Sequence, residues 1–351
     1  MHVIGIIGCG RIARGAHFPA LAPMEDVRIK YACDLILSKA EEMKETYPKI
    51  ENVTTDYQEV LADPEVEAVF ILTPNYAHYT LSMEALKAGK HVFCEKPITV
   101  NYALSKEMAE EAARQGKMLN IGVCNRFHAS VELLEKMNRE GKFGKIYHVN
   151  AAFRACRSIP GLGGPFTTKA QSGGGVLIDW GVHYLDLILY ILGIPALKTV
   201  SCSAYNEIAK DMKAYRYNGM WADDTMDIEN GTNDVDDYVV GLVRTEGASI
   251  SFNGAWAQNL DIDERYIDFL GDKGGARLSY CGQIHLFDGQ TLTPTDTDHE
   301  CPDFYGREDR SFFTAIETGV KDKNNIENVL QSAELLDLLY QSAEKQEEIK
   351  L

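Results

Sequence analysis

Residues 3–13 read VIGIIGCGRIA, an apolar run that ends at Gly8 and continues through Gly10 into a helical pattern. The apolar run is typical of a buried strand. Gly8 permits a tight turn, and Gly10 lets the backbone approach another molecule because glycine has no side chain. Ala13 keeps the third position small, as close packing of a helix on the strand requires. Strand, glycine turn and helix in this order predict the first unit of a Rossmann fold.

The same stretch predicts a dinucleotide site. The amino end of a helix offers free N–H groups and a positive dipole end to a pyrophosphate. Asp34 follows the second apolar run, where a carboxylate can accept hydrogen bonds from both ribose hydroxyls of an adenosine. A 2′-phosphate there would meet like charge, and the next residues, Leu35, Ile36 and Leu37, include no arginine. We therefore expect NAD to be preferred over NADP.

Short apolar runs alternate with amphipathic stretches over the first 124 residues. The runs are 3–7, 27–32, 66–72, 91–94 and 118–123, and the stretches between them are 11–21, 37–47, 75–88 and 102–115. Strands and helices that alternate with short links predict a parallel sheet covered by helices on both faces. Residues 1–124 are thus expected to form a doubly wound Rossmann domain.

After residue 124, strands follow one another with few helices between them. Helical patterns cover 129–140, 176–192, 309–319 and 326–344, a glycine-rich loop covers 159–175, and strand patterns cover 145–154, 200–205, 238–244, 248–256, 265–271 and 276–280. Short turns between strands predict a large, open, mostly antiparallel sheet with helices on one face. We expect residues 125–351 to form a second, α+β domain, whose last helix can pack back on the first.

Length and charge narrow the class of partner. The chain has 351 residues, 45% apolar and 25% charged, with a formal charge of −17. The composition excludes a disordered chain and a disulfide scaffold. So acidic a chain is poorly suited to bind nucleic acid or anionic lipid. Residues 1–124 hold 13 basic and 17 acidic side chains, or −4, which leaves −13 for the rest. A small neutral ligand suits that acidic half best.

The sequence also predicts a cytoplasmic protein. No apolar run approaches the roughly 20 residues that cross a bilayer, and the amino terminus lacks the cationic segment of a signal peptide. The eight cysteines stand singly, as reduced thiols do, at 9, 33, 94, 124, 156, 202, 281 and 301. They make no Cys/His set at zinc spacing, so no metal is expected.

Glu95, Lys96 and Pro97 form the first stretch with side chains suited to chemistry. They follow the run 91–94, and ligands of such folds bind at the carboxyl ends of parallel strands. A lysine held there can take part in proton transfer. The alternative is an ordinary surface lysine before a proline.

The second stretch runs from three glycines, 173–175, into Asp179, Trp180 and His183. Residues four apart share one face of a helix, so Asp179 and His183 can point into one pocket. An Asp and His pair in an otherwise apolar helix is costly unless both are paired or functional. The structural alternative is a core histidine satisfied by the aspartate. A metal site would need further ligands, which no spacing supplies.

Taken together, these motifs resemble the Gfo/Idh/MocA oxidoreductases, a family that includes glucose-fructose oxidoreductase and inositol dehydrogenase. The resemblance covers nearly the whole chain. It rests on GCGRIA at 8–13, Thr73-Pro74-Asn75 with His78, Glu95-Lys96-Pro97, the glycine run into Asp179-x-Gly181-x-His183, and the closing helices around 313–319. Trp180 departs from the family, where a smaller apolar residue is common, and its ring can stack on a sugar face or narrow the pocket.

The resemblance implies an active site between a Rossmann domain and a second domain whose open sheet mediates a homo-oligomer, a dimer or tetramer. It also implies sugars, inositols or related polyols as substrates. The catalytic residues would be Lys96, Asp179 and His183. The cofactor-binding residues would be Gly8, Gly10, Arg11, Ile12, Asp34, Thr73, Pro74, Asn75, His78, Glu95, Lys96 and Asn125. The substrate-binding residues would be Lys96, Arg154, Phe166, Asp179, Trp180 and His183.

We expect a hydride to pass between a secondary alcohol and NAD while His183, oriented by Asp179, or Lys96 takes the hydroxyl proton. The sequence does not decide which of His183 and Lys96 accepts the proton. One alternative is a redox-neutral enzyme that keeps NAD bound while it processes a sugar or glycoside. A non-catalytic NAD or sugar sensor, and a dihydrodiol or biliverdin substrate, are lesser alternatives.

Three other features leave alternatives open. Arg154 can contact substrate or form a structural ion pair. The loop 160–172 can close over a substrate or be a plain surface loop. The segment 223–237 carries seven carboxylates and no basic residue. It is predicted to be a solvated loop, with oligomer contacts or the covering of a site as alternatives.

Overall fold

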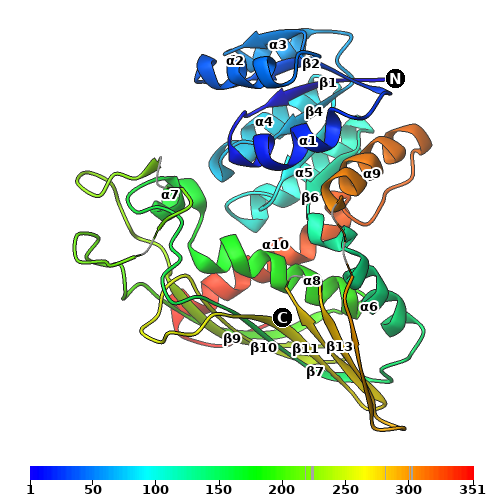
Figure 1. The fold of residues 1–351 in the computed structure, drawn as a ribbon, viewed down its shortest axis with the longest axis vertical. Helices are drawn as coiled ribbons and strands as arrows, with labels where there is room; N and C mark the ends of the chain where they lie inside the picture. Colours follow the sequence, from blue (N-terminus) through cyan, green and yellow to red (C-terminus); the bar gives the residue numbers. More distant parts are fainter. Residues whose placement is uncertain (218, 223–224, 281, 300, 302) are drawn as a thin grey trace. The chain divides into compact units, whose positions relative to one another are not determined.

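The computed structural model describes residues 1–217, 219–222, 225–280, 282–299, 301 and 303–351 (Figure 1). The chain divides into two compact units, Met1–Phe127 with Pro302–Leu330, and His128–Cys301 with Gln331–Leu351. The sequence expectation assigned everything after residue 124 to the second domain. In the structure, α9 (Phe304–Thr318) adds Phe312 and Phe313 to the core of the first unit, so that unit draws on two separate parts of the chain.

The first unit contains a six-stranded parallel sheet in the order β3-β2-β1-β4-β5-β6. Its strands are β1 (His2–Ile7), β2 (Val27–Cys33), β3 (Asn52–Thr54), β4 (Ala68–Ile71), β5 (His91–Glu95) and β6 (Leu119–Gly122). β1 lies between β2 and β4, so the strand order reverses beside it. This is the topology of a doubly wound Rossmann sheet, as predicted.

Helices follow most strands of this sheet. They are η1 (Ala13–His17), α1 (Phe18–Leu21), α2 (Leu37–Thr46), α3 (Tyr57–Ala62), α4 (Asn75–Lys87), α5 (Tyr102–Gln115) and η2 (Cys124–Phe127). The helix that starts at Arg11 is continuous to Leu21, but η1 within it is π-helical. The sequence analysis did not predict β3 and α3. They are short, and α3 depends on a local cap in which Asp56 accepts a hydrogen bond from Gln58 N at 2.9 Å.

The second unit contains a nine-stranded open sheet in the order β14-β13-β12-β11-β7-β10-β9-β8-β15. Its strands are β7 (Ile146–Arg154), β8 (Leu197–Tyr205), β9 (Tyr238–Thr245), β10 (Ser249–Ala255), β11 (Glu264–Gly271), β12 (Gly274–Ser279), β13 (Ile284–Asp288), β14 (Thr293–Thr297) and β15 (Ile349–Lys350). β10 pairs with β7 in parallel, and the other described pairs are antiparallel. The predicted open, mostly antiparallel sheet is confirmed. The sequence analysis missed β13, β14 and β15, which are short and largely exposed.

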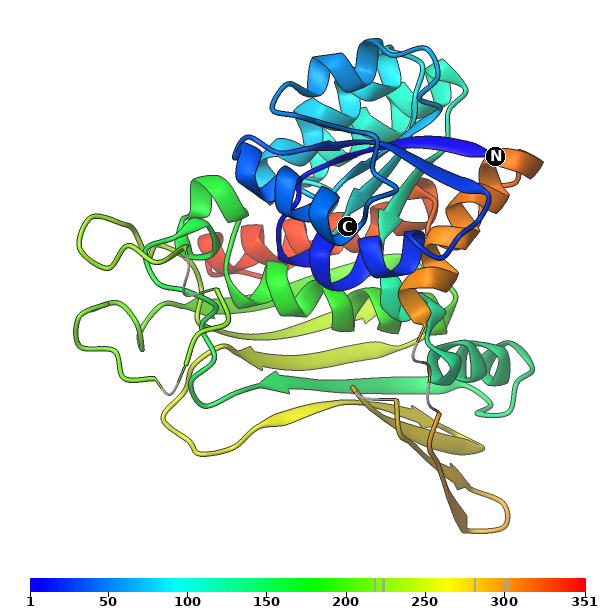
Figure 2. The ribbon, with the colours of Figure 1, turned by 45° about the horizontal axis from the view of Figure 1, so that its top comes forward.

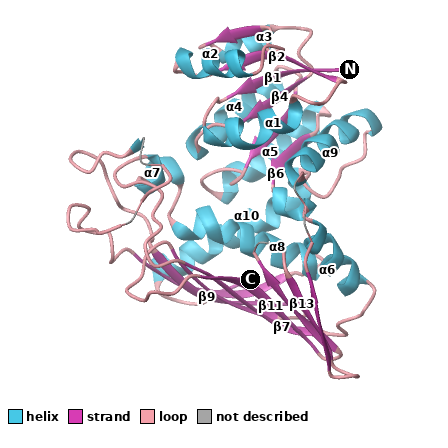
Figure 3. Ribbon diagram, viewed as in Figure 1, coloured by secondary structure: helices cyan, strands magenta, loops and turns pink. Residues whose placement is uncertain are grey.

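Helices cover one face of this sheet. They are α6 (Ala129–Arg139), η3 (Pro165–Thr167), α7 (Lys169–Ser172), η4 (Leu177–Gly181), α8 (Val182–Leu192) and α10 (Ile326–Lys345). α8 and α10 run side by side along the sheet (Figures 1 and 2), and Ser332 of α10 donates a hydrogen bond to Asp186 of α8 at 2.6 Å. Long loops surround α7 (Figure 3). This packing puts η4 and α8 at the centre of the second unit.

One helical stretch among the described residues, Lys169–Leu192, is long and apolar enough to cross a membrane by length and composition. The sequence analysis did not anticipate it. Within its apolar window, 72% is buried inside the protein. Leu185, Ile188 and Leu189 in its second half belong to the core of the second unit. The stretch therefore has the burial expected of a core helix.

Candidate active site

The turn after β1 depends on glycine. Gly8 has a φ of +102°, and a Cβ there would lie 2.5 Å from the carbonyl oxygen of Leu72. A side chain would thus be strained and would push β1 away from the end of β4. A Cβ on Gly10 would meet no atom of the described residues within 4 Å. Gly10 thus leaves the backbone open at the start of the helix from Arg11 and Ile12, the place where helices of this kind bind phosphate groups.

Asp34 lies at the carboxyl end of β2, and backbone groups fix its carboxylate. Oδ2 accepts a hydrogen bond from Cys9 N at 2.8 Å, and Oδ1 accepts one from Ile36 N at 2.9 Å. Asp34 is half-buried, and a carboxylate has lone pairs to accept further bonds. The carboxylate is thus held beside the glycine turn, where the sequence analysis expected it to meet a ribose.

The segment after β4 contacts the segment after β5. Pro74 precedes α4, Asn75 begins it, and His78 is fully buried in its first turns. The two ring nitrogens of His78 lie 2.8 Å from the carbonyl oxygens of Thr73 and Pro97. Burial lowers the pKa of His78, which favours the neutral ring. The Thr73 hydroxyl is buried and has no hydrogen-bond partner among the described residues.

Lys96 follows β5 and is half-buried. Its backbone N–H donates to Glu95 Oε2 at 2.9 Å, and the peptide bond from Lys96 to Pro97 is cis. Asn125 is half-buried in η2, after β6. Because the strands are parallel, the segments that follow β1, β2, β4, β5 and β6 share one edge of the sheet. That edge brings the predicted cofactor residues together with Lys96.

The neighbouring Arg126 has a structural role. It is 1% exposed, and its guanidinium donates to the carbonyl oxygens of Lys323 and Asn328, at 2.5 and 3.2 Å. These bonds tie η2 to the segment that follows α9. Arg126 therefore holds the first unit together.

Asp179, Trp180 and His183 lie on the second unit, in η4 and the first turn of α8. All three are half-buried, while Ile178, Gly181 and Val182 beside them are buried. They therefore form the accessible side of an otherwise buried helix. The guanidinium of Arg265 lies 5.0 Å above the Trp180 ring, and the rings of His183 and Tyr280 are 6.4 Å apart. The predicted continuous α-helix from residue 176 begins in fact with the π-helical η4.

Asp236 fixes the start of this helix. Its carboxylate accepts hydrogen bonds from Gly175 N at 2.8 Å, Leu177 N at 2.9 Å and the Tyr340 hydroxyl at 2.9 Å. The Tyr340 hydroxyl also lies 3.2 Å from Ile178 N, which donates to it. These contacts occupy backbone N–H groups that the first turn would otherwise leave without partners. Asp236 and Tyr340 thus set the direction in which Asp179 and His183 project.

These contacts correct the prediction for the acidic segment 223–237. Residues 223 and 224 lie outside the described residues, but Asp236 and Asp237 are only 7% and 3% exposed. Asp237 Oδ2 accepts hydrogen bonds from Glu207 N and Ile208 N, at 3.0 and 2.6 Å. The solvated-loop interpretation is therefore wrong for the end of the segment. Backbone donors brought there by distant loops stabilise these carboxylates, and the sequence pattern does not reveal them.

Replacing Asp236 with asparagine should lower the free energy of unfolding by on the order of 2–3 kcal/mol, because the new amide places an N–H group against a backbone N–H. The substitution should also lower kcat, because the start of the helix that carries Asp179 would be less well ordered. Urea unfolding and steady-state kinetics measure both. Glu229→Gln removes a charge from the same segment, where Glu229 is exposed and pairs with Lys213 at 2.6 Å. That control should stay within about 0.5 kcal/mol; equal losses in the two variants would contradict the assigned role.

Two predicted substrate residues have protein contacts of their own. Arg154 forms an ion pair with Glu264 on the adjacent strand β11, so the ion-pair interpretation accounts for it; a substrate contact stays a prediction. The Phe166 ring packs edge-on against Trp221 at 4.7 Å. The loop that carries Phe166 is tied to the acidic segment, since Asp227 N donates to Leu162 O at 3.0 Å.

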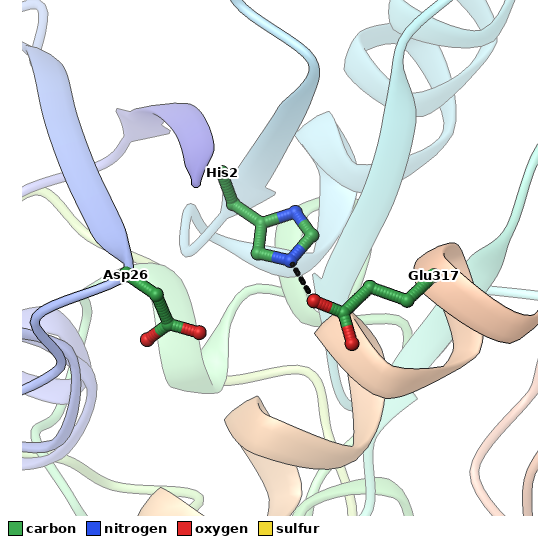
Figure 4. Close-up of side chains that lie close together, drawn as sticks. All are labelled: His2, Asp26 and Glu317. Carbon is green, nitrogen blue, oxygen red and sulfur yellow. Dashed lines mark hydrogen bonds and ion pairs between the residues drawn. The ribbon is translucent and has the colours of Figure 1, made fainter.

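One group of possible metal ligands occurs among the described residues: His2, Asp26 and Glu317, with ligand atoms within 4.8 Å of one another (Figure 4). Arg310 already binds both Asp26 oxygens, at 2.5 and 2.8 Å, and its hydrogen bond lowers the pKa of Asp26 to about 2. His2 lies 3.1 Å from Glu317. The guanidinium supplies the positive charge that balances these acids, so the group is an ion-pair network at the amino ends of β1 and β2.

The sequence analysis missed a buried group beneath Lys96. His17, at the end of η1, lies 2.9 Å from Glu95 and 2.9 Å from Asp309 of α9. Its side chain and that of Asp309 are fully buried, and that of Glu95 is 8% exposed. Position 309 is far along the chain, so no spacing pattern could have linked it to His17.

A Rossmann sheet with a glycine turn, and with an aspartate and a lysine at the same edge, is typical of a nucleotide-dependent oxidoreductase. Residues 3–123 match the model of the oxidoreductase family with an NAD-binding Rossmann fold, and residues 131–277 match the GFO/IDH/MocA C-terminal domain. The chain belongs to the GFO/IDH/MocA oxidoreductase family. The family inferred from the sequence motifs is thus confirmed.

Individual relatives support the same assignment. D-glucoside 3-dehydrogenase of Escherichia coli (strain K12) is 33% identical over 282 residues, which cover 78% of this chain and 76% of the relative. Myo-inositol 2-dehydrogenase of Thermotoga maritima is 30% identical over 190 residues, 54% of each chain. The structure of levoglucosan dehydrogenase in complex with NADH and levoglucosan shares the fold, with a TM-score of 0.85, 20% identity and 99% of both chains covered.

Proposed function

We propose that this protein is an NAD-dependent dehydrogenase that moves a hydride between a secondary alcohol of a sugar, inositol or glycoside and the nicotinamide. The half-buried Asp179 and His183 on the accessible side of a buried helix carry this proposal, because polar side chains there can contact a substrate. The relatives that act on D-glucosides and myo-inositol support the substrate class. The acidic second half of the chain favours a neutral polyol over a phosphorylated one.

The residues at the carboxyl edge of the first sheet fit a dinucleotide. Gly8 permits the turn, Gly10 leaves room for the pyrophosphate, Asp34 has remaining lone pairs for a ribose, and the Thr73 hydroxyl has no partner among the described residues. The remaining proposed contacts come from the same edge: Arg11, Ile12, Pro74, Asn75, His78, Glu95, Lys96 and Asn125. Bound NAD would supply the hydride acceptor.

We further propose that NAD is preferred over NADP. Next to Arg11, Arg14 is the arginine that lies nearest to the glycine turn in the sequence. Its Nε donates to Cys9 O at 2.9 Å, and its guanidinium pairs with Glu42 at 2.8 Å. Those contacts compete with binding of a 2′-phosphate. Leu35 is 83% exposed and Ile36 52% exposed, so apolar surface lies beside Asp34 for an adenine ring.

Wild-type kcat/KM should be at least tenfold higher with NAD than with NADP, and Asp34→Ala should raise the KM for NAD about tenfold and narrow this preference. Initial rates with both cofactors measure it. Asp26→Asn is the matched control, because Asp26 and Asp34 stand at opposite ends of β2. A wild-type protein that turns over NADP tenfold faster in kcat/KM would refute the preference.

In the proposed mechanism, Lys96, Asp179 and His183 act on one substrate hydroxyl. Asp179 orients His183, and His183 takes the hydroxyl proton as the hydride leaves the carbon that bears this hydroxyl. Lys96 holds the oxygen and stabilises its developing negative charge, or takes the proton itself. Either arrangement places a positive group beside that oxygen, an effect typically worth several kcal/mol in the barrier. Trp180, held by Arg265, borders this pair and limits the size of the sugar that enters.

A panel of monosaccharides, inositols and glycosides with NAD, followed by the absorbance of reduced cofactor, tests the proposed function. Turnover of at least one neutral sugar or polyol is expected. The ultraviolet spectrum of the purified protein provides a second readout. A blank panel together with retained dinucleotide would favour the redox-neutral alternative, and a blank panel without it would favour a sensor.

We also propose that the protein is cytoplasmic and forms a homo-oligomer through the outer face of the second sheet. Val240, Leu270 and Phe287 alternate with core-facing residues and are 42%, 39% and 42% exposed. Apolar side chains on an open sheet are typical of an interface. Light scattering should show a dimer or tetramer, and Val240→Glu with Leu270→Glu should dissociate it. A wild-type monomer at micromolar concentration would contradict the proposal.

A further inference from the structure

The buried group beneath Lys96 joins three parts of the first unit. His17 ends η1, the continuation of the glycine-turn helix; Glu95 ends β5; and Asp309 lies in α9. His17 Nε2 lies 2.9 Å from Glu95 Oε1, and His17 Nδ1 lies 2.9 Å from Asp309 Oδ1. The other Glu95 oxygen accepts the Lys96 N–H at 2.9 Å. A chain of contacts thus runs from α9 through His17 and Glu95 to the backbone of Lys96.

The two carboxylates beside His17 favour its charged form. A neutral imidazole has one N–H and can donate to one carboxylate, whereas an imidazolium donates to two. Both ring nitrogens face carboxylate oxygens at hydrogen-bond distance. Burial lowers the pKa of His17, but Asp309 and then Glu95 outweigh burial and hold that pKa well above its ordinary value. The rings around it, Phe70, Phe93 and Tyr305, exclude water.

α9 carries a second buried carboxyl, Glu308, next to Asp309. Burial raises the pKa of both carboxyls; the charge and hydrogen bond of His17 oppose this rise at Asp309, whereas the charge of Glu95 adds to it at Glu308, whose pKa lies well above the ordinary value. The ring nitrogens of His17 lie against Asp309 and Glu95, so Glu308 is not one of its hydrogen-bond partners. Cys124 of η2 also faces this region, and burial raises its pKa. The imidazolium of His17 is thus a cation that Glu95 and Asp309 share.

We propose that His17 is a positioning residue for the reaction: held by Asp309, its imidazolium fixes Glu95, which fixes the backbone of Lys96 at the end of β5. The inference rests on the proposed role of Lys96. It assigns to Asp309 the task of keeping His17 charged, because a buried imidazolium with one carboxylate is less stable than one with two. It also links the helix that begins at the glycine turn to Lys96.

Nitrogen NMR on the full protein labelled at histidine and lysine tests this directly. Wild-type His17 should remain an imidazolium at neutral pH. In Asp309→Asn the pKa of His17 should fall, and the Lys96 amide should shift with the same midpoint. Glu308→Gln is the matched control, since Glu308 is adjacent to Asp309 and equally buried but is not a hydrogen-bond partner of His17. It should leave the titration of His17 near wild type. The Lys96 amide signal is assigned as the lysine signal that disappears in Lys96→Arg.

Kinetics provides the second arm. In Asp309→Asn, kcat should fall about tenfold as pH rises through the lowered pKa of His17, a loss that wild type and Glu308→Gln do not show. If Asp309→Asn does not fold, His17→Gln is used in its place. This variant should shift the Lys96 amide signal and lower kcat while the KM for NAD stays unchanged. The inference is overturned if His17 is neutral in the wild type at pH 7, or if the Lys96 amide signal does not change when His17 changes its charge. Absence of turnover with an intact amide response overturns the proposed function instead.

Discussion

Lys96→Ala should lower kcat by two or more decades while NAD affinity stays within a few-fold. The lysine is expected to stabilise negative charge that develops on the substrate oxygen, so its loss is felt in the transition state more than in cofactor binding. A hundredfold loss corresponds to about 2.7 kcal/mol in the barrier. Steady-state rates with the best substrate of the panel, and quenching of protein fluorescence by NADH, measure the two effects separately.

Two further variants sharpen this prediction. Lys106→Ala removes an exposed lysine from α5 in the same unit and should leave kcat unchanged. Lys96→Arg keeps the charge but changes its shape and reach, so it should restore part of the lost rate. Full activity in Lys96→Ala would remove this lysine from the mechanism and leave His183 as the acceptor of the proton.

The sequence predicted those parts of the fold that depend on local patterns. The alternation of strands and helices, the glycine turn and the run of antiparallel strands each reflect periodicity or a conformational need of nearby residues. The structure confirms the resulting architecture. Asp34 was placed from its position after the second apolar run, and the structure holds it at the end of β2 by contacts with Cys9 N and Ile36 N.

Contacts between distant parts of the chain were beyond such reasoning. Asp309 stabilises His17 although the two residues lie 292 positions apart in the chain. In the same way, Phe312 and Phe313 of α9 complete the first core. Asp236 looked like one more acid in a hydrated segment, because the N–H groups of Gly175 and Leu177 that bind it belong to another loop. Buried carboxylates of this kind take their meaning from tertiary partners, which composition does not encode.

His183→Ala should also lower kcat by two or more decades, with NAD affinity again within a few-fold. If His183 takes the hydroxyl proton, it must be unprotonated before the reaction, so wild-type kcat/KM should fall at acidic pH. Replacing His183 with alanine should abolish this fall in kcat/KM on the acid side of the pH profile, its acid limb. If Lys96 is the acceptor, Lys96→Ala abolishes the limb and His183→Ala keeps it. The pH dependence of kcat/KM in the two variants therefore assigns the proton acceptor.

Asp179→Asn should produce a smaller loss than His183→Ala, because it weakens the orientation of His183 and leaves the ring in place. His285→Ala is the matched control in the second unit, since its imidazole is exposed and pairs with Asp296 at 2.6 Å; it should be silent. In the double variant lacking Lys96 and His183, the losses should combine to less than their product if both residues act on one hydroxyl. Fully multiplicative losses would mean that the two residues act in separate steps, and the shared-hydroxyl mechanism would then be wrong.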